Sequence, residues 1–231
     1  MNGHIKDAGE SPPVITYLLL TVTVLIQIYL SVLHPSDARQ IYDTFSLIPV
    51  NFFIGKNLDS LASYMFIHGN LLHLLVNSVA LYGAGVIVER DIGSIRYLTV
   101  FIVSGVISGV VHCALNSSST LPLVGSSGAI FGVIATLFLL MPFKLTLALV
   151  VPLPSVAVGL MLILVELSTF WMPTDIGIAH DVHVSGFVIG GIMAFIYDRK
   201  RALKGLFIAT VILAMIYYIG VYFKVIPVSA F

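Results

Sequence analysis

One charge-free stretch constrains this 231-residue chain more than any other feature. The 47 residues from Tyr97 to Phe143 contain no Asp, Glu, Lys or Arg. An apolar run of that length indicates membrane-spanning segments. Inside it stands a polar Gly-Ser-Ser-Gly sequence, Gly125–Gly128, which follows Pro122. These residues predict the start of an apolar helix that runs from Ser126 to Met141 and stops before Pro142.

This helix is too short to cross a membrane by itself. Its 16 residues cover about 24 Å, against a hydrocarbon core of about 30 Å. Non-helical backbone has to supply the remaining depth, and it is tolerated there only when buried in protein or lining a water-filled cavity. A serine at this helix start is therefore a candidate for a catalytic role. The alternative is that Ser126 and Ser127 only cap the helix and allow close packing, the more frequent role of such serines.

The composition excludes a water-soluble globule. Hydrophobic residues make up 58% of the chain and charged residues 10%, whereas soluble domains carry about 25% charged residues. The expected fold class is all-α, a polytopic membrane helix bundle. The net charge is zero and no basic cluster is interleaved with aromatic residues, so no nucleic-acid partner is expected. The single Cys113 precludes an internal disulfide.

Seven apolar segments are expected to be membrane helices. In order they are Pro13–Leu33, Leu71–Val88, Ile95–Leu115, Ser126–Met141, Ser155–Trp171, Ala179–Tyr197 and Gly205–Phe223. Three parts follow from this division. Residues 1–12 form a cytoplasmic N-terminus, residues 13–198 form a core of six helices with a long outer loop at 34–70, and residues 199–231 form a basic cytoplasmic linker and the seventh helix.

The distribution of Lys and Arg predicts the orientation, because these residues concentrate in cytoplasmic loops. With the N-terminus inside and the C-terminus outside, eight basic residues are cytoplasmic and three are not. The cytoplasmic ones are Lys6, Arg90, Arg96, Lys144, Arg199, Lys200, Arg201 and Lys204, and the others are Arg39, Lys56 and Lys224. The second, fourth and sixth helices then all begin at the outer face, and the cell membrane is the expected location.

A base for the serine is available on the sixth helix. A serine hydroxyl becomes a good nucleophile only when a base takes its proton, and histidine is the usual base. In the sequence AHDVHVSGFVIGG, His183 shares one helix face with two glycines. Two such small-residue faces can pack backbone to backbone, which would bring His183 within reach of Ser127. The glycines are Gly128 and Gly132 on the fourth helix and Gly186 and Gly190 on the sixth.

The second helix offers groups for a developing oxyanion. In HGNLLHLLVN, His73 and Asn77 lie at i and i+4 on one face near the outer end. Acyl transfer needs donors of this kind, and the backbone N–H of Ser127 at a helix start is another. The alternative role for His73 and Asn77 is hydrogen bonding between helices alone.

With these pieces the chain resembles the rhomboid family of intramembrane serine proteases. The matching motifs are HGNLLHLLVN, GVIVERDIG, GSSGAIFG and AHDVHVSGFVIGG, and the resemblance covers about Ser60 to Asp198. It implies Ser127 as nucleophile, His183 as general base and transmembrane proteins as substrates. It further implies His73, Asn77 and the Ser127 amide around the oxyanion, His68 in the loop above the site, Phe131 packed near the catalytic histidine, Glu89 and Gly93 at the cytoplasmic turn, and supporting glycines at Gly125, Gly128, Gly186 and Gly190.

The chain also departs from the family pattern. Many members carry Trp-Arg where this chain has Asp59 and Ser60, and its only tryptophan is Trp171. No third member of a triad is evident, because Asp181 lies at i and i+2 from His183 and such residues do not face each other. The expected mechanism is a Ser-His dyad without metal or cofactor. Lateral substrate entry is expected at the fifth helix, which follows Pro152 and Pro154 and precedes a short loop, Met172–Ile178.

Four alternatives remain open at this point. A metal site could use His180 and His183 with His68 or His73, although the H-E-x-x-H pattern is absent. A thiol site at Cys113 and His112 is disfavoured because adjacent helical residues point apart. A transporter is disfavoured because Glu166 has no evident charged partner. A catalytically silent rhomboid-like protein that binds membrane clients would lack the serine or the histidine. The sequence leaves the oligomeric state undetermined.

Overall fold

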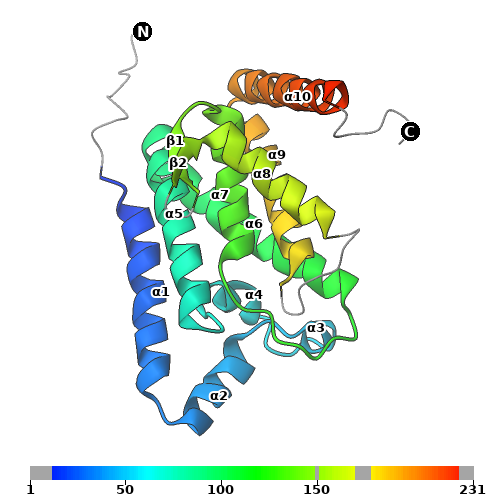
Figure 1. Cartoon of the computed structure of the whole chain (residues 1–231). Coiled ribbons are helices and arrows are strands. Elements are labelled where there is room, and N and C mark those ends of the chain that lie inside the picture. Colours follow the sequence, from blue (N-terminus) through cyan, green and yellow to red (C-terminus); the bar gives the residue numbers. More distant parts are fainter. Residues whose placement is uncertain (1–11, 149–150, 170–177, 224–231) are drawn as a thin grey trace.

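The structure, a computed structural model, describes residues 12–148, 151–169 and 178–223. Within these residues the chain is a bundle of helices with one small hairpin, which confirms the expected fold class (Figure 1). The long helices are α1 (Val14–Val32), α5 (Leu71–Ile92), α6 (Ser94–Leu115), α7 (Ser127–Leu140), α8 (Ser155–Ser168), α9 (His180–Tyr197) and α10 (Arg199–Tyr222). Among the described residues, α1, α5, α6, α9 and α10 are long and apolar enough to cross a membrane.

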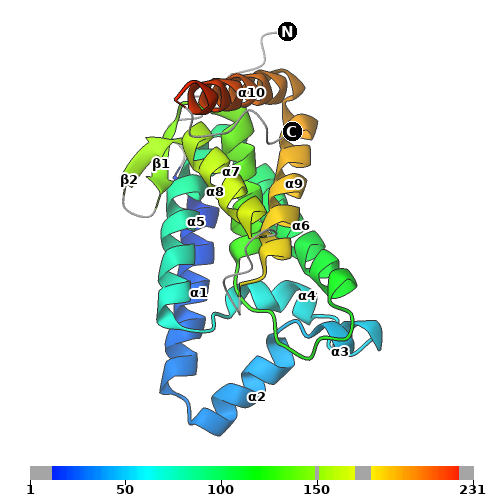
Figure 2. The same cartoon turned by 45° about the vertical axis from the view of Figure 1, so that its right-hand side comes forward.

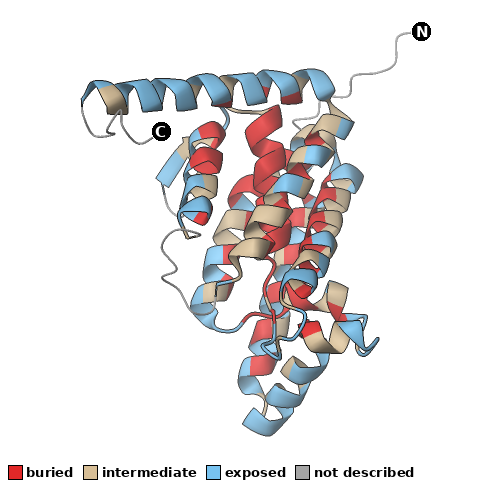
Figure 3. Ribbon diagram, turned by 90° about the vertical axis from the view of Figure 1, so that its right-hand side faces the viewer, coloured by how far each residue is buried: buried red, intermediate tan, exposed pale blue. Residues whose placement is uncertain are grey.

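The short helix α7 forms the centre of the bundle. Every residue from Gly128 to Leu140 is buried, and α7 packs against α5, α6, α8 and α9. A helix that is apolar on all sides is stable only when it is surrounded in this way. Its 14 residues extend about 21 Å, which confirms that α7 is too short to span by itself. Figure 3 shows the buried residues concentrated along this axis.

The connection between α1 and α5 contains short helices and is hydrogen-bonded to the segment before Ser127. It comprises α2 (Pro35–Phe45), α3 (Pro49–Phe53), α4 (Ser60–Ser63) and the 3₁₀ turn η1 (Tyr64–Phe66), all at the end where α5, α7 and α9 begin (Figure 1). Leu47 and Leu123 exchange two backbone hydrogen bonds of 3.0 and 2.9 Å, and Gly125 N donates to Tyr64 O at 2.9 Å. Burial raises the pKa of Tyr64 to about 12, so its hydroxyl stays protonated and donates to Gly105 O at 2.7 Å.

A β-hairpin at the opposite end connects α7 to α8. Strands β1 (Leu145–Ala148) and β2 (Val151–Pro154) pair antiparallel, with Leu145 opposite Pro154. The sequence predicted only an interrupted apolar segment here. The hairpin packs closely against α5: a Cβ added at Gly83 of α5 would lie only 3.0 Å from Leu147 Cβ of β1. The backbone of Ser155 donates to Lys144 O at 2.9 Å, which fixes the start of α8 beside the end of α7.

The first helix is held at its N-terminus by Glu89. The Glu89 carboxylate accepts from Ile15 N at 2.9 Å, from Thr16 N at 2.8 Å and from Thr16 Oγ1 at 2.7 Å. Ser94 Oγ donates to the same carboxylate at 2.7 Å. These bonds satisfy N–H groups that a helix start leaves unpaired. Helix α5 continues through Ile92, one turn beyond the expected end at Val88, and stops at Gly93, whose φ is +85°.

The basic segment after α9 is helical, so its prediction as a linker was wrong. Arg199 to Lys204 form the first turns of α10, because Asp198 caps that helix by accepting from Arg201 N at 3.0 Å and because Lys and Arg are good helix formers. Arg201 also forms an ion pair with Asp91. The expected seventh span is part of α10, and this helix lies across the end of the bundle (Figures 1 and 2).

Candidate functional site

The helices that carry Ser127 and His183 touch through their glycines. A Cβ added at Gly186 would lie 2.1 Å from Gly128 O, and one at Gly190 would lie 2.0 Å from Gly132 O. No side chain fits between backbones at that separation. The expected backbone-to-backbone contact of the two small-residue faces is therefore present.

Ser127 is the first residue of α7. The chain enters the helix through Gly125, whose φ of +108° favours glycine. Ser126 occupies the N-cap position, but its side chain makes no capping hydrogen bond, so simple capping does not account for that serine. Ser127 is half-buried, and its hydroxyl has no hydrogen-bond partner among the described residues. Catalytic hydrogen bonds are often long without substrate and tighten when substrate binds.

The imidazole of His183 lies over the first turn of α7. Its ring stacks on Phe131 with centroids 4.3 Å apart and planes inclined by 6°. Phe131 follows Ser127 by four residues, so the two side chains share one face of α7. The stacked ring brings the predicted base to the same helix face as the predicted nucleophile.

A carboxylate that the sequence analysis did not assign to the site contacts His183. Glu166 of α8 is buried, and its Oε1 is 2.8 Å from His183 Nδ1 while its Oε2 is 2.6 Å from His180 Nδ1. No third member of a triad and no charged partner for Glu166 were evident from the sequence, whereas the structure pairs Glu166 with His183 and His180. The pairing joins two helices, so no local spacing encodes it. The available signal was a lone acid within an apolar span.

Asp181, the acid nearest to His183 in the sequence, contacts His112 and Asn116. His112 Nδ1 lies 2.8 Å from Asp181 Oδ2, and Asn116 Nδ2 donates to the same oxygen at 3.1 Å. Both partners belong to the end of α6. This arrangement agrees with the expectation that Asp181 is not the acidic partner of His183. It joins the end of α6 to the start of α9.

The two predicted oxyanion residues lie beside the chain that enters α7. A Cβ added at Gly125 would be 2.6 Å from His73 Nε2 and 3.4 Å from Asn77 Nδ2. Glycine at this position therefore leaves room for both side chains two residues before Ser127. The structure brings His73 and Asn77 to the same end of the bundle as Ser127 and His183.

His68 contacts this pair and is fully buried. Its Nε2 is 2.9 Å from Asn77 Nδ2, and its ring is 4.9 Å from that of His73. Burial, with a smaller contribution from His73, lowers the pKa of His68 to about 4. His68 is therefore neutral near pH 7. The amide nitrogen of Asn77 can donate to Nε2 of this neutral ring, which fixes the orientation of Asn77.

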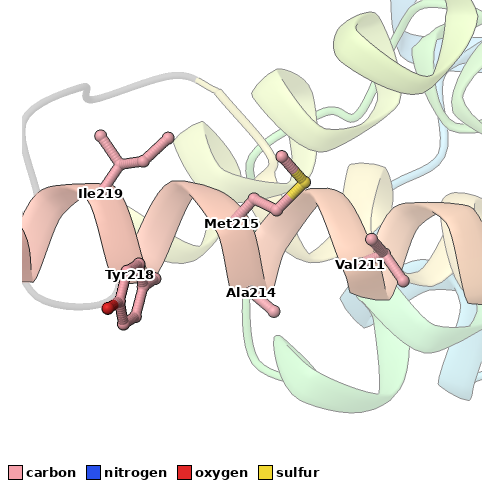
Figure 4. Close-up of a pocket in the computed structure, with 5 residues that line it drawn as sticks. All are labelled: Val211, Ala214, Met215, Tyr218 and Ile219. Atoms are coloured by element: carbon pink, nitrogen blue, oxygen red, sulfur yellow. The ribbon is translucent and has the colours of Figure 1, made fainter.

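Two further places have features of binding sites. The ligand atoms of Glu166, His180 and His183 lie within 4.8 Å of one another and could hold a cation. That group contains neither His68 nor His73, which the metal hypothesis had included. Figure 4 shows an apolar hollow lined by five side chains, all from α10. It belongs to one helix at the opposite end of the bundle from Ser127.

The fold and the site define a class, a polytopic helical membrane protein in which the helices that carry Ser127 and His183 pack through their glycines. The family description "Rhomboid domain" matches residues 56–200 of the chain. The chain belongs to the rhomboid family.

Curated relatives support this assignment at low identity. The chain is 26% identical to Rhomboid protease GlpG of Haemophilus influenzae over 60% of this chain and 69% of the relative. It is 27% identical to Rhomboid protease GluP of Bacillus subtilis over 54% of this chain and 24% of the relative. It is 26% identical to RHOMBOID-like protein 5 of Arabidopsis thaliana over 59% of this chain and 43% of the relative. The match thus spans less than half of the length of the last two.

Proposed function

We propose that the chain is an intramembrane serine protease that hydrolyses peptide bonds in the transmembrane helices of other proteins. One observation carries the proposal: the glycine contact between α7 and α9 holds the His183 ring on Phe131, one turn from Ser127. Two of the similar proteins are rhomboid proteases, which supports the same activity.

The reaction uses His183 as base and then as acid. Ser127 Oγ attacks the carbonyl carbon of the peptide bond, and its proton passes to Nε2 of His183. The C–N bond breaks as His183 gives this proton to the leaving amine nitrogen, and an acyl ester remains on Ser127. Water then attacks the ester while His183 again takes a proton. The ester C–O bond breaks, the acid product leaves, and the proton returns to Ser127 Oγ.

Donors near Gly125 stabilise the negative charge that develops on the carbonyl oxygen. The backbone N–H of Ser127 belongs to the first turn of α7 and has no partner within the helix. Asn77 Nδ2 and His73 Nε2 flank the chain two residues earlier. Each such donor contributes about 10²- to 10³-fold to turnover in acyl transfer.

Substrate enters from lipid and is cut near the outer face. Helix α7 is about 9 Å shorter than a hydrocarbon core of about 30 Å, so Ser127 lies several Å below the outer surface. A substrate helix keeps its amides in internal hydrogen bonds and has to unwind before attack. Gly or Pro in the substrate lowers helix stability and favours cutting. The α8 gate that the sequence predicts remains part of this proposal, and its loop at 172–178 lies mostly outside the described residues.

Purified protein in detergent with a generic single-span substrate tests the activity. Ser127→Ala and His183→Ala are each expected to lower kcat by about 10⁴-fold or more, the scale for losing a nucleophile or its base. Ser126→Ala is the matched control, because the adjacent serine is buried and caps nothing, and it is expected to keep most activity. Mass spectrometry of the products is expected to locate the cuts in the outer third of the substrate span.

Two results would contradict this function. Cleavage by Ser127→Ala at the wild-type rate would remove the nucleophile assignment. A wild-type protein that binds membrane helices but cuts none would favour the catalytically silent, client-binding member of the family.

A further inference from the structure

The buried carboxylate of Glu166 connects α8 to the histidines of α9. Glu166 is 5% exposed, and its two oxygens lie 2.8 Å from His183 Nδ1 and 2.6 Å from His180 Nδ1. Each oxygen therefore has its own imidazole partner. The carboxylate bridges a helix at the bundle periphery and the helix that carries the proposed base.

These contacts select the protonation state of His183. A carboxylate only accepts hydrogen bonds, so the His183 nitrogen that faces Glu166 carries a proton. The neutral ring then has its lone pair on Nε2, the nitrogen available to Ser127. The opposite tautomer would present an N–H to the serine and could not take its proton.

Stability alone does not explain an acid at this position. Burying a charged pair is costly, and replacing such a pair with apolar residues is often neutral or stabilising. The other buried side chains of α8 are Ser155 and the apolar Val156, Val158 and Leu160. A leucine at 166 would continue that surface. The carboxylate instead contacts the ring of the proposed base.

We propose that Glu166 is a positioning residue that holds His183 in the tautomer and orientation needed by Ser127. This inference rests on the proposed protease function and changes its dyad into a Ser127–His183–Glu166 arrangement. Glu166 stays ionised throughout the reaction. It stabilises the imidazolium that forms when Ser127 gives up its proton, and it takes no proton itself.

A metal ion bound to Glu166, His180 and His183 would select the opposite tautomer of His183. The same three ligand atoms lie within 4.8 Å of one another, a spacing that a divalent cation could bridge. Coordination at His183 Nδ1 would leave the proton on Nε2 and block transfer from Ser127. The positioning role therefore predicts that EDTA leaves kcat unchanged. Activity that EDTA removes and Zn²⁺ restores would overturn it.

Glu166→Gln tests the role while keeping the side-chain size. We expect kcat to fall by about 10²- to 10⁴-fold, the upper value being that for a base held in the wrong tautomer, with KM nearly unchanged. The matched control is His180→Asn, which removes only the other partner of Glu166 and is expected to lower kcat less than 10-fold. Equal losses of kcat and of melting temperature in both variants would assign the cluster to packing.

The pH dependence of kcat/KM distinguishes a positioning role from a packing role, because loss of packing alone would not shift it. The groups facing His183 are Glu166 from α8, Phe131 from α7, His180 on its own helix and His73 from α5. Among them Glu166 is the only acid. Without its negative charge the imidazolium is less stable, so the acid limb of the Glu166→Gln profile is expected to move to lower pH. An unchanged limb and kcat, with Ser127→Ala inactive, would overturn this inference alone.

A measurement that needs no substrate separates the two proposals. Nitrogen NMR of ¹⁵N-histidine-labelled wild-type protein, with His183 assigned by comparison with His183→Gln, is expected to show the proton on Nδ1 and an unprotonated Nε2 near pH 7. Glu166→Gln is expected to populate the other tautomer. A proton on Nε2 in the wild-type protein would overturn the positioning role, whether proteolysis is confirmed or refuted. This wild-type measurement also decides the question if Glu166→Gln fails to fold.

Discussion

The role of each site residue depends on which residues contact it from neighbouring helices. Ser127, His183, His73 and Asn77 were predicted from residue type, local spacing and family motifs, and the structure brings them to one end of the bundle. Glu166 was missed because it reaches His183 from another helix. Local periodicity identifies which face a residue occupies, but it does not identify the residue that meets that face from a neighbouring element.

His68 gives a pH dependence to the stability of the folded protein. Its pKa is about 4 in the folded protein and about 6.5 when unfolded. Between these values the unfolded chain binds more protons, so stability rises with pH and is lost as the pH falls from about 6.5 towards 4. We expect the melting temperature in detergent to drop over this range. His68→Gln should flatten the slope, whereas His34→Gln, at an exposed histidine, should leave it as in the wild-type protein. An unchanged slope in His68→Gln would contradict this assignment.

Among the elements, α7 and α9 pack backbone to backbone through two glycines on each helix. The small-residue faces were predictable because glycines recurred at helical spacing in both segments. The hairpin from Leu145 to Pro154 was not, since a short apolar run is compatible with either a strand or a buried helix. The start of α10 was placed too late because its basic residues were interpreted as a loop, although they are good helix formers.

Two neighbouring glycines of α9 provide a paired test of this contact. A Cβ at Gly190 would lie 2.0 Å from Gly132 O, whereas one at Gly191 would be 3.6 Å from Leu139 Cδ1, an ordinary contact. Gly190→Ala should separate the helices, destabilise the protein by about 1–3 kcal/mol as overpacking does, and lower cleavage. Gly191→Ala should do neither. Thermal unfolding of both variants in one detergent measures the difference, and equal melting temperatures would show that the contact is not limiting.

At the scale of the whole molecule, α10 differs most from the expected arrangement. It lies across the end of the bundle (Figures 1 and 2), and its buried residues are only Ala202, Gly205 and Ala209. Large apolar side chains are exposed along its length, including Phe207 and Tyr218. A helix without a polar face is typical of a membrane span. Lying across the bundle, α10 is not aligned with the other candidate spans, so the prediction that it crosses the bilayer with its end outside requires α10 to turn relative to the bundle.

Single cysteines in a Cys113→Ala background test this orientation. Arg39→Cys and Phe223→Cys should react with a membrane-impermeant maleimide in intact cells, and Lys200→Cys should react only after permeabilisation. Arg39→Cys serves as the reference for the outer face. Labelling of Phe223→Cys only after permeabilisation would keep α10 on the cytoplasmic side and overturn the outside C-terminus. Labelling of Lys200→Cys in intact cells would invert the whole topology.

The contact between Glu89 and α1 has a consequence for the order of assembly during synthesis. The backbone N–H groups of Ile15 and Thr16 bind a carboxylate that lies more than seventy residues later in the chain. When α1 is synthesised, Glu89 does not yet exist, so these N–H groups need another partner until it does. Helix α1 can dock on the bundle only after Glu89 and Ser94 have been made. Helix α1 therefore makes these contacts only after the end of α5 has been synthesised.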